Sequence, residues 1–278
     1  LSALYLKGLE GVIGHSIAHS TWARTRPDDA NDTHHGWHFR APGDDPVTNS
    51  EGHGSFECDD ALIPDTVNGC KTVREIYDIA GDEFGKYTTP ILWDTKHKTI
   101  VSNESTVILR ILNDDFHALA NYKDVNIYPE ELQEETDKLN SSLIYNSINN
   151  GVYRCGFATK QKAYEAALDE LFGALDEVEG RLAASTTTYL TGEKFTWLDL
   201  RLYHTLVRFD PVYVVYFKCN RRRIEDYPHL LRYVRSVYKI PAMKATTNIR
   251  HIKMHYFSSH PALNKYGIIP ASNGPKLE

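Results

Sequence analysis

The segment TTPILWDTKHKTIVSNES, residues 88–105, limits the fold more than any other part of this sequence. Its apolar runs Ile91–Trp93 and Thr99–Val101 are separated by a polar turn, which predicts a β-hairpin. The preceding residues KTVREIYDIAG, 71–81, have the spacing of a short helix, and another helix is expected directly after the hairpin. This order of elements predicts a βα-plus-ββα arrangement.

The proline at the start of this hairpin raises a chemical question, because Pro90 has no amide hydrogen to give to a strand. If the Thr89-Pro90 peptide is cis, the backbone of Thr89 turns outward and can pair with the peptide of a ligand. Glu104 and Ser105 stand at a helix start, which suits a ligand carboxylate, and Glu104 can accept from an amino group. A ligand with a peptide backbone and an amino-acid end fits these residues, as does a simple tight turn with a helix cap.

The first half of the chain contains fewer regular patterns. Leu1, Leu4 and Leu9 have helical spacing, and the run Val12–His19 has the composition of a strand. No Ser, Thr, Asp or Asn cap precedes the helix, so we expect its N-terminus and the strand leading into it upstream of residue 1. Residues 23–68 are polar and rich in Gly, Asp, His and Pro, which predicts a long surface excursion.

The second half is predicted to be helical. Pro129 followed by two glutamates favours a helix start, and apolar residues recur at helical spacing from Tyr164 to Leu182. The sequence TWLD, residues 196–199, has the form of a capping box with aspartate in place of the usual glutamate. We place the boundary between the two parts of the chain between Phe116 and Ile127.

Charge and composition exclude several classes of function. A net charge of -6 argues against a nucleic-acid or anionic-membrane partner, and the cluster Arg221–Arg223 is interpreted as a solvated helix face. The four cysteines form no CxxC pair, and no apolar run is long enough to cross a bilayer, so we expect a reducing, cytoplasmic setting. No metal site is expected, because the histidines, His15, His19, His34, His35, His38 and His53, lack metal-type spacing with a strong partner.

Several longer motifs resemble one known family over almost the whole chain. They are GWHF (36–39), NNGVYRCGFATKQKAYEAAL (149–168), TWLDLRLYHTLVRFDPVYVVYFKCN (196–220), YPHLLRYVRSVYKIPAM (227–243) and HIKMHYFSSHPALNKYGIIP (251–270). They closely resemble the S-glutathionyl-hydroquinone reductases, the Xi-class glutathione transferases. The resemblance implies a glutathione-transferase fold, α/β plus all-α, with glutathione as co-substrate and a homodimeric assembly. The thioredoxin-like domain is then residues 1–115, without its first strand and catalytic motif, and the all-helical acceptor-site domain with a C-terminal extension is residues 127–278.

The same resemblance implies a glutathione site. Thr89 and a cis Pro90 would hold the cysteinyl backbone of glutathione, and Glu104 with Ser105 its γ-glutamyl end. The family usually has valine before this proline, and threonine is expected to be tolerated because the backbone makes the contact. Trp37 matches the aromatic residue that covers glutathione, although a loop anchor packed on the core is an alternative interpretation.

The resemblance also implies an acceptor site for quinol conjugates. Tyr153 and Tyr213 match the acceptor-site tyrosines, whose phenols can stack on a quinol ring and supply a proton. Without the family, either tyrosine is more often an ordinary core residue.

The family reaction needs a cysteine thiolate at the start of the first helix, in a CPWAH-type motif that registers upstream of Leu1. This cysteine attacks the thioether sulfur of a glutathionyl-hydroquinone, and a second glutathione resolves the mixed disulfide. Cys70 is a weak candidate for a substitute, and Ser2 lies too late in the chain. We therefore expect the chain from Leu1 to be nearly inactive. The alternative function is a non-catalytic protein of the same fold that binds glutathione or aromatic ligands.

Overall fold

The computed structural model describes residues 1–278, which divide into two units. The helical unit comprises Leu1–Leu9, Phe116–Ile249 and Pro270–Glu278, and the hairpin unit comprises Glu10–Asp115 and Arg250–Ile269. The predicted domains differ from these units in two segments. Leu1–Leu9 packs with the helical unit, and Arg250–Ile269 packs with the hairpin unit. The boundaries 1–115 and 127–278 remain a prediction.

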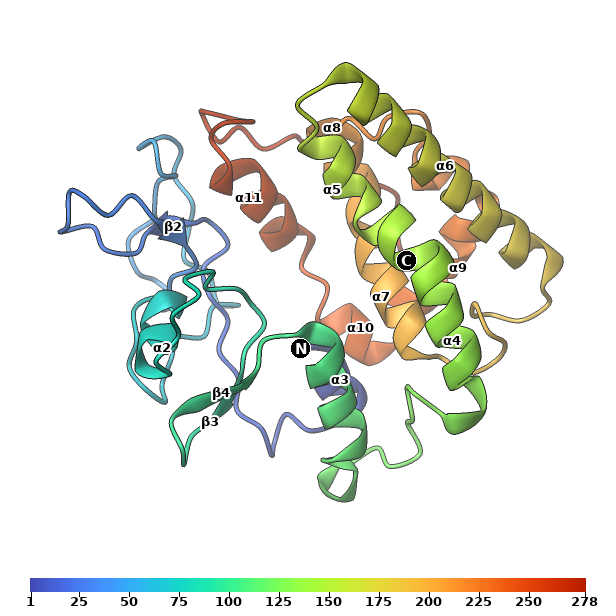
Figure 1. The fold of residues 1–278 in the computed structure, drawn as a ribbon, viewed down its shortest axis with the longest axis horizontal. Coiled ribbons are helices and arrows are strands. Elements are labelled where there is room, and N and C mark those ends of the chain that lie inside the picture. The colour runs from blue at the N-terminus through green and yellow to red at the C-terminus, as the bar shows by residue number, and fades with distance from the viewer. The chain divides into compact units, whose positions relative to one another are not determined.

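The helical unit is built from helices that pack side by side. Its α-helices are α1 (Ser2–Leu6), α4 (Gln133–Leu139), α5 (Gly151–Gly156), α6 (Gln161–Ala184), α7 (Trp197–Arg208), α8 (Val214–Tyr216), α9 (Pro228–Tyr238) and α10 (Pro241–Ala245). Two π-helical segments, η3 (Asn140–Asn149) and η4 (Phe209–Tyr213), and three 3-10 turns, η1 (His117–Leu119), η2 (Glu130–Leu132) and η5 (Ile224–Asp226), complete it. The segments α4, η3 and α5 form one rod that packs along α6 (Figure 1).

The periodic patterns of this unit gave correct predictions. The apolar face of α6 is buried, with at most 1% exposure at Leu171, Phe172, Leu175, Val178 and Leu182. The capping box at α7 is present, since Asp199 accepts from the backbone N–H and the hydroxyl of Thr196, both at 2.9 Å. At Pro129 the chain first makes the 3-10 turn η2, and α4 follows it.

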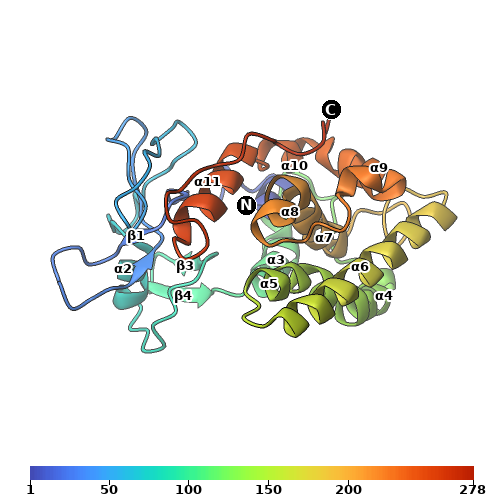
Figure 2. The same cartoon turned by 90° about the horizontal axis from the view of Figure 1, so that it is seen from above.

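The hairpin unit contains two short antiparallel strand pairs and three helices. Strand β1 (Ala23–Arg24) pairs with β2 (His35–Gly36), and β3 (Leu92–Asp94) pairs with β4 (Thr99–Ser102). The helices are α2 (Val73–Ile79), α3 (Ser105–Asp114) and α11 (Ile249–Ser259). Figure 2 shows α2 beside the β3–β4 hairpin. Ile91, Trp93 and Ile100 pack against the core cluster to which Val73 and Ile76 of α2 belong.

The predicted β3–β4 hairpin and the helix after Lys71 are confirmed, and both have local causes. The carboxylate of Asp94 accepts from the backbone N–H groups of Lys96 and His97, which closes the turn. Helix α2 starts at a capping box in which Thr72 and Glu75 satisfy each other's backbone amides.

Two predictions for the first half of the chain are wrong. The run Val12–His19 forms no strand, and Ile17 makes only an isolated bridge to Ile63. Residues 23–68 are not merely a surface excursion, because Phe39, Phe56 and Leu62 are at most 8% exposed. Burial there depends on contacts that are distant in sequence, such as Phe56 with Gly267.

Helix α11 and the tail after it are bound to this first half by polar contacts. The hydroxyl groups of Thr21 and Ser258 are 2.7 Å apart, and the backbone N–H of Trp22 donates to Ser259 Oγ at 3.0 Å. Arg250 pairs with Asp59 at 3.0 Å. The C-terminal segment 250–269 is therefore an integral part of the hairpin unit.

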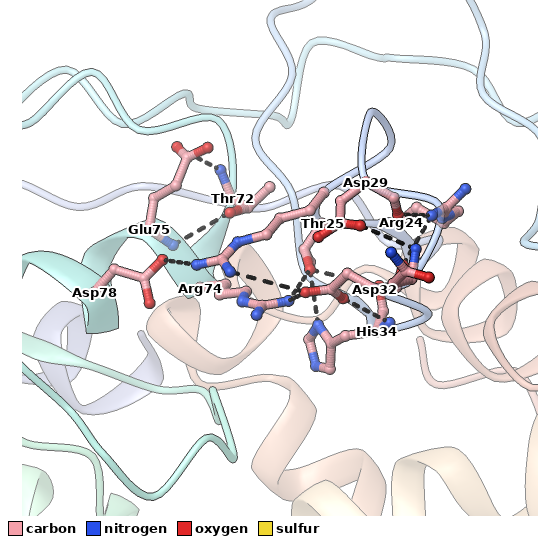
Figure 3. Close-up of polar contacts among 11 residues, drawn as sticks. Arg24, Thr25, Asp29, Asp32, His34, Thr72, Arg74, Glu75 and Asp78 are labelled. Atoms are coloured by element: carbon pink, nitrogen blue, oxygen red, sulfur yellow. Dashed lines mark hydrogen bonds and ion pairs between the residues drawn. The ribbon is translucent and has the colours of Figure 1, made fainter.

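Helix α2 also orders the loop between β1 and β2. Arg74 points from α2 into this loop, where it pairs with Asp32 at 2.6 Å and donates to Thr25 Oγ1 at 3.3 Å (Figure 3). Thr25 Oγ1 lies 2.8 Å from His34 Nδ1. The side chains of Arg74 and Asp32 are only 11% and 14% exposed, so this ion pair is better shielded than an ordinary surface pair.

Candidate functional site

The loop before β3 has the exposed backbone that the sequence predicted. The Thr89-Pro90 peptide is cis, as expected, and Thr88, Thr89 and Pro90 are exposed. Neither the backbone N–H nor the carbonyl of Thr89 forms a hydrogen bond within the chain. Both groups are therefore available to the peptide of a ligand.

The start of α3 lies where Glu104 and Ser105 were expected to act. Glu104 is the N-cap, and its Oε1 accepts from the backbone N–H of Thr106 at 3.2 Å and from Ser105 Oγ at 3.4 Å. Its second oxygen, Oε2, accepts no hydrogen bond within the chain, and both Glu104 and Ser105 are exposed. The helix start thus offers a free carboxylate oxygen for a cationic group and helix amides for an anionic one.

A tyrosine that the sequence reasoning missed joins these two loops. The hydroxyl of Tyr77 donates to the carbonyl of Thr88 at 2.8 Å and accepts from Asn103 Nδ2 at 3.0 Å. Asn103 Nδ2 also donates to Thr88 Oγ1 at 3.2 Å. Thr88 and Asn103 each precede a predicted glutathione-binding pair directly, so these bonds hold the two pairs near each other. In the sequence, the one indication that this network exists was the position of Asn103 directly before Glu104.

Trp37 lies in the hairpin unit in a setting that fits both of its interpretations. Its ring stacks on His255 of α11, with centroids 4.4 Å apart, and meets Trp22 edge-on at 5.9 Å. Its carbonyl accepts from the backbone N–H of Val73 at 3.0 Å, and its side chain packs on the core that contains Phe39. Trp37 anchors its loop, and its role in covering glutathione stays a prediction.

The two predicted acceptor-site tyrosines belong to one aromatic cluster of the helical unit. The rings of Tyr153 and Tyr213 are 6.1 Å apart, and Tyr213 stacks on Phe217 at 5.4 Å with an interplanar angle of 11°. Tyr213 is 2% exposed and Tyr153 is 42% exposed. Tyr153 is thus the accessible phenol of the pair.

Tyr153 also lines an open groove of about 590 Å³ between α5 and α6. The other residues that line it are Asn150, Arg154, Phe157, Ala158, Ala163, Ala166, Ala167 and Glu170. Arg154 and Glu170 form an ion pair of 2.8 Å, while the surface between them is largely apolar. Such a groove suits a flat aromatic ring.

The thiols of this chain lie in settings that oppose nucleophilic attack. Burial, followed by the charge of Asp65, raises the pKa of the Cys70 thiol to about 12. A hydrogen bond with Cys155, together with burial, raises the pKa of Cys219, and the same bond lowers the pKa of Cys155. Because Cys155 and Cys219 are 1% and 0% exposed, neither sulfur can reach a substrate. Cys58 is buried as well.

Other groups that the sequence raised have structural partners. Ser2 Oγ lies 2.8 Å from Thr246 Oγ1 and 3.2 Å from His204 Nε2, so it serves to dock α1. Among residues 1–278, no group of three or more His, Cys, Asp or Glu side chains is arranged to hold a metal ion. No helix has both the length and the apolar character needed to cross a membrane.

Comparison with known proteins assigns this chain to a class of proteins. The family model described as "Glutathione S-transferase, C-terminal domain" matches residues 161–236. Glutathionyl-hydroquinone reductase PcpF from Sphingobium chlorophenolicum is 40% identical over 276 residues, which cover 98% of this chain and 77% of PcpF. Glutathionyl-hydroquinone reductase YqjG from Escherichia coli is 48% identical over 191 residues, or 69% of this chain and 56% of YqjG.

Solved structures agree with this assignment. The glutathione-bound structure of YqjG superposes with a TM-score of 0.82 at 39% identity, covering 99% of this chain and 79% of YqjG. The Xi glutathione transferase ECM4 from Saccharomyces cerevisiae superposes with a TM-score of 0.85 at 32% identity, covering 100% of this chain and 87% of ECM4. The fold is that of a glutathione transferase, as the sequence predicted. Within that class, the chain belongs to the glutathionyl-hydroquinone reductases of the Xi class.

Proposed function

We propose that this chain binds glutathione on its hairpin unit as part of a glutathionyl-hydroquinone reductase. The observation that carries the proposal is the unpaired, exposed peptide of Thr89, held near the exposed start of α3. The N–H and carbonyl of Thr89 pair with the cysteinyl peptide of glutathione. Glu104 Oε2 accepts from its α-amino group, and Ser105 with the first amides of α3 binds its α-carboxylate. Trp37 covers the bound tripeptide.

The reaction proceeds through two thiolate attacks and consumes one glutathione thiol per turnover, because the enzyme cysteine is regenerated. In the keto tautomer of the substrate, a cysteine thiolate attacks the thioether sulfur, the carbon–sulfur bond breaks, and its electron pair returns to the ring as hydroquinone. A second glutathione then attacks the enzyme–glutathione disulfide and releases glutathione disulfide. The attacking cysteine is the one in the CPWAH-type motif that the family resemblance implies, because the four thiols of residues 1–278 are buried.

The helical unit supplies the acceptor site. Tyr153, at the edge of the groove between α5 and α6, stacks on the quinol ring and provides the proton that the ring gains. Tyr213 lies behind it and, through its stacking on Phe217, fixes the cluster from which Tyr153 projects. The non-catalytic alternative is not favoured, because the relatives named above are reductases.

The assembly and the compartment are part of the same proposal. The protein acts as a homodimer in the cytoplasm, without a nucleic-acid or membrane partner. Four free cysteines fit a reducing compartment, and a net charge of -6 does not favour binding to polyanions.

Calorimetric titration of glutathione into the Glu104→Ala variant tests the proposal. The variant is expected to bind about tenfold or more weakly, since a hydrogen bond to a charged group is lost. Glu130→Ala is the matched control, because it removes an exposed glutamate from the start of another helix, η2. Unchanged affinity in Glu104→Ala would place glutathione elsewhere.

A further inference from the structure

The two halves of the proposed glutathione site lie on the segments that enter and leave one hairpin, at its open end. Thr88–Pro90 precedes β3, and Asn103–Ser105 follows β4, so the chain between them runs out and back along the hairpin. The strand pairing begins at Leu92 with Ser102, beside a bulge, and does not extend to residues 88–90 and 103–105. A ligand that contacts both halves needs them held at one separation.

We propose that the hydroxyl of Tyr77 is a positioning group that sets this separation and thereby determines the affinity for glutathione. The inference rests on the proposed function, because it takes Thr89 and Glu104 as ligand contacts. Tyr77 itself does not touch glutathione. It acts through Thr88 and Asn103, each adjacent to one of those contacts.

The chemistry of the phenol suits this bridge. One hydroxyl donates to the Thr88 carbonyl at 2.8 Å while it accepts from Asn103 Nδ2 at 3.0 Å. Asn103 Nδ2 closes the triangle on Thr88 Oγ1 at 3.2 Å. Phenylalanine at position 77 would keep the ring and remove all the bonds of the hydroxyl, including its 3.2 Å contact with Thr88 Oγ1, so the loops would lose their link without a cavity.

The ring that carries this hydroxyl is held from several sides. Tyr77 is 3% exposed in the core of the hairpin unit, on a helix that starts with a capping box. Its ring meets Tyr87 edge-on at 5.7 Å, and the Arg74 guanidinium lies over Tyr87 at 5.1 Å. Arg74 is itself fixed by Asp32 at 2.6 Å (Figure 3). A fixed phenol can impose a fixed distance on two exposed loops.

The role differs from ordinary support of the fold. Thr88 and Asn103 are both exposed, so water can replace the lost bonds when the hydroxyl is removed. The cost to folding is then small, and the cost to binding is larger because the ligand must order two loops that the protein no longer orders.

Calorimetric titration of glutathione into Tyr77→Phe tests this inference. The dissociation constant is expected to rise about 5- to 30-fold, since the hydrogen bonds of the Tyr77 hydroxyl that order the site are lost. The thermal midpoint should stay within a few degrees of the unchanged protein. Tyr266→Phe, an exposed tyrosine of the same unit, is the matched control and should leave the affinity unchanged.

Asn103→Ala gives an independent second variant, which matters if Tyr77→Phe folds poorly. This variant removes the two hydrogen bonds that Asn103 Nδ2 donates, and position 103 is exposed. The dissociation constant for glutathione should rise by a similar factor. The double variant should lose less than the sum of the single losses, because both residues belong to one network. In the full-length reductase, the KM for glutathione should rise while kcat at saturating glutathione stays within about twofold.

The outcomes separate this inference from the proposed function. If Glu104→Ala weakens glutathione while Tyr77→Phe and Asn103→Ala bind it as tightly as the unchanged chain, the positioning role is refuted and the site stands. If none of the three variants changes the affinity, both the site and the positioning role are refuted. A drop in the thermal midpoint with unchanged affinity assigns Tyr77 to the fold alone and refutes the inference.

Discussion

The indole of Trp37 and the imidazole of His255 stack face to face, with ring centroids 4.4 Å apart and planes inclined by 22°. Trp37 belongs to the loop after β2, and His255 to α11, near the end of the chain. His255 is fixed in turn, since its Nδ1 lies 2.9 Å from the Ser20 carbonyl oxygen. The C-terminal helix therefore determines the orientation of the proposed glutathione-covering residue.

We expect His255→Ala to weaken glutathione binding several-fold, because the Trp37 ring loses the partner that orients it. Trp37→Ala should cause an equal or larger loss. His53→Ala is the control, since the ring of His53 meets Tyr266 at 4.8 Å instead. Calorimetric titration measures all three, and full affinity in both His255→Ala and Trp37→Ala would leave Trp37 as a loop anchor only.

The features that the sequence predicted well have local causes. The hairpin depends on its turn, in which Asp94 accepts from the backbone N–H groups of Lys96 and His97. The start of α3 depends on Glu104 at the N-cap. The long helix α6 depends on a repeat of apolar residues within a single segment. Each of these signals is contained in a few neighbouring residues, and so it can be seen without knowledge of the tertiary structure.

The features that the sequence did not reveal depend on distant partners. Tyr77 has no special pattern around it, and its role becomes visible only when Thr88 and Asn103 are placed beside it. The stack of Trp37 on His255 joins two residues that are far apart in the sequence. Val12–His19 has the composition of a strand, but it pairs with no neighbouring strand and therefore forms no ladder.

The exposed phenol of the acceptor cluster should control turnover and not glutathione affinity. Tyr153→Phe in the full-length reductase is expected to lower kcat at least about tenfold, because the proton donor is removed while the ring remains. Its affinity for glutathione should not change. Tyr122→Phe, at a tyrosine that is 56% exposed, is the control. Parallel losses of turnover and affinity in Tyr153→Phe would mean that the hydroxyl supports the fold.

Cys70 should behave as an inert thiol. With a pKa raised to about 12 by burial and by Asp65, only about one thiol in ten thousand is ionised at pH 8. We expect its alkylation by iodoacetamide, followed by mass spectrometry, to be far slower than that of a cysteine introduced at the exposed position 83 by Glu83→Cys. Rapid alkylation of Cys70 in the folded protein would contradict this, and so would loss of glutathione binding in Cys70→Ser.

The capping box of α7 should matter for stability far beyond an ordinary cap. Asp199 is 0% exposed, and it accepts from the Thr196 N–H and hydroxyl, the Leu190 N–H and the Tyr233 hydroxyl. Asp199→Ala would leave these donors without a partner, and we expect the free energy of unfolding to fall by about 3 kcal/mol or more in urea titration. Asp226→Ala removes an exposed aspartate from a similar motif at η5 and should cost much less. Equal effects of the two substitutions would show that burial of Asp199 is unimportant.

A pair of buried histidines in the hairpin unit should make its stability depend on pH. The rings of His19 and His38 are 5.1 Å apart, and the residues are 1% and 7% exposed. Burial, followed by the charge of His19, lowers the pKa of His38 to about 4, and burial lowers the pKa of His19. Arg40 adds positive charge nearby. At a pH between the folded and unfolded pKa values, both histidines are therefore neutral in the folded protein and protonated in the unfolded chain.

The sign of the effect follows from proton uptake. Between about pH 6.5 and pH 4 the unfolded chain binds more protons than the folded one, so the stability from the neutral histidines is present above pH 6.5 and is lost as the pH falls. We expect the free energy of unfolding, measured in urea, to decrease between pH 7.5 and pH 5 and His38→Gln to reduce that decrease by about 1–3 kcal/mol. Glutamine can keep a donor toward the carbonyl of Thr21, which His38 Nε2 approaches to 3.0 Å. His53→Gln, at a partly exposed histidine without an ion-pair partner, should leave the pH dependence unchanged, and an equal reduction in both variants would rule out burial of His38 as the cause.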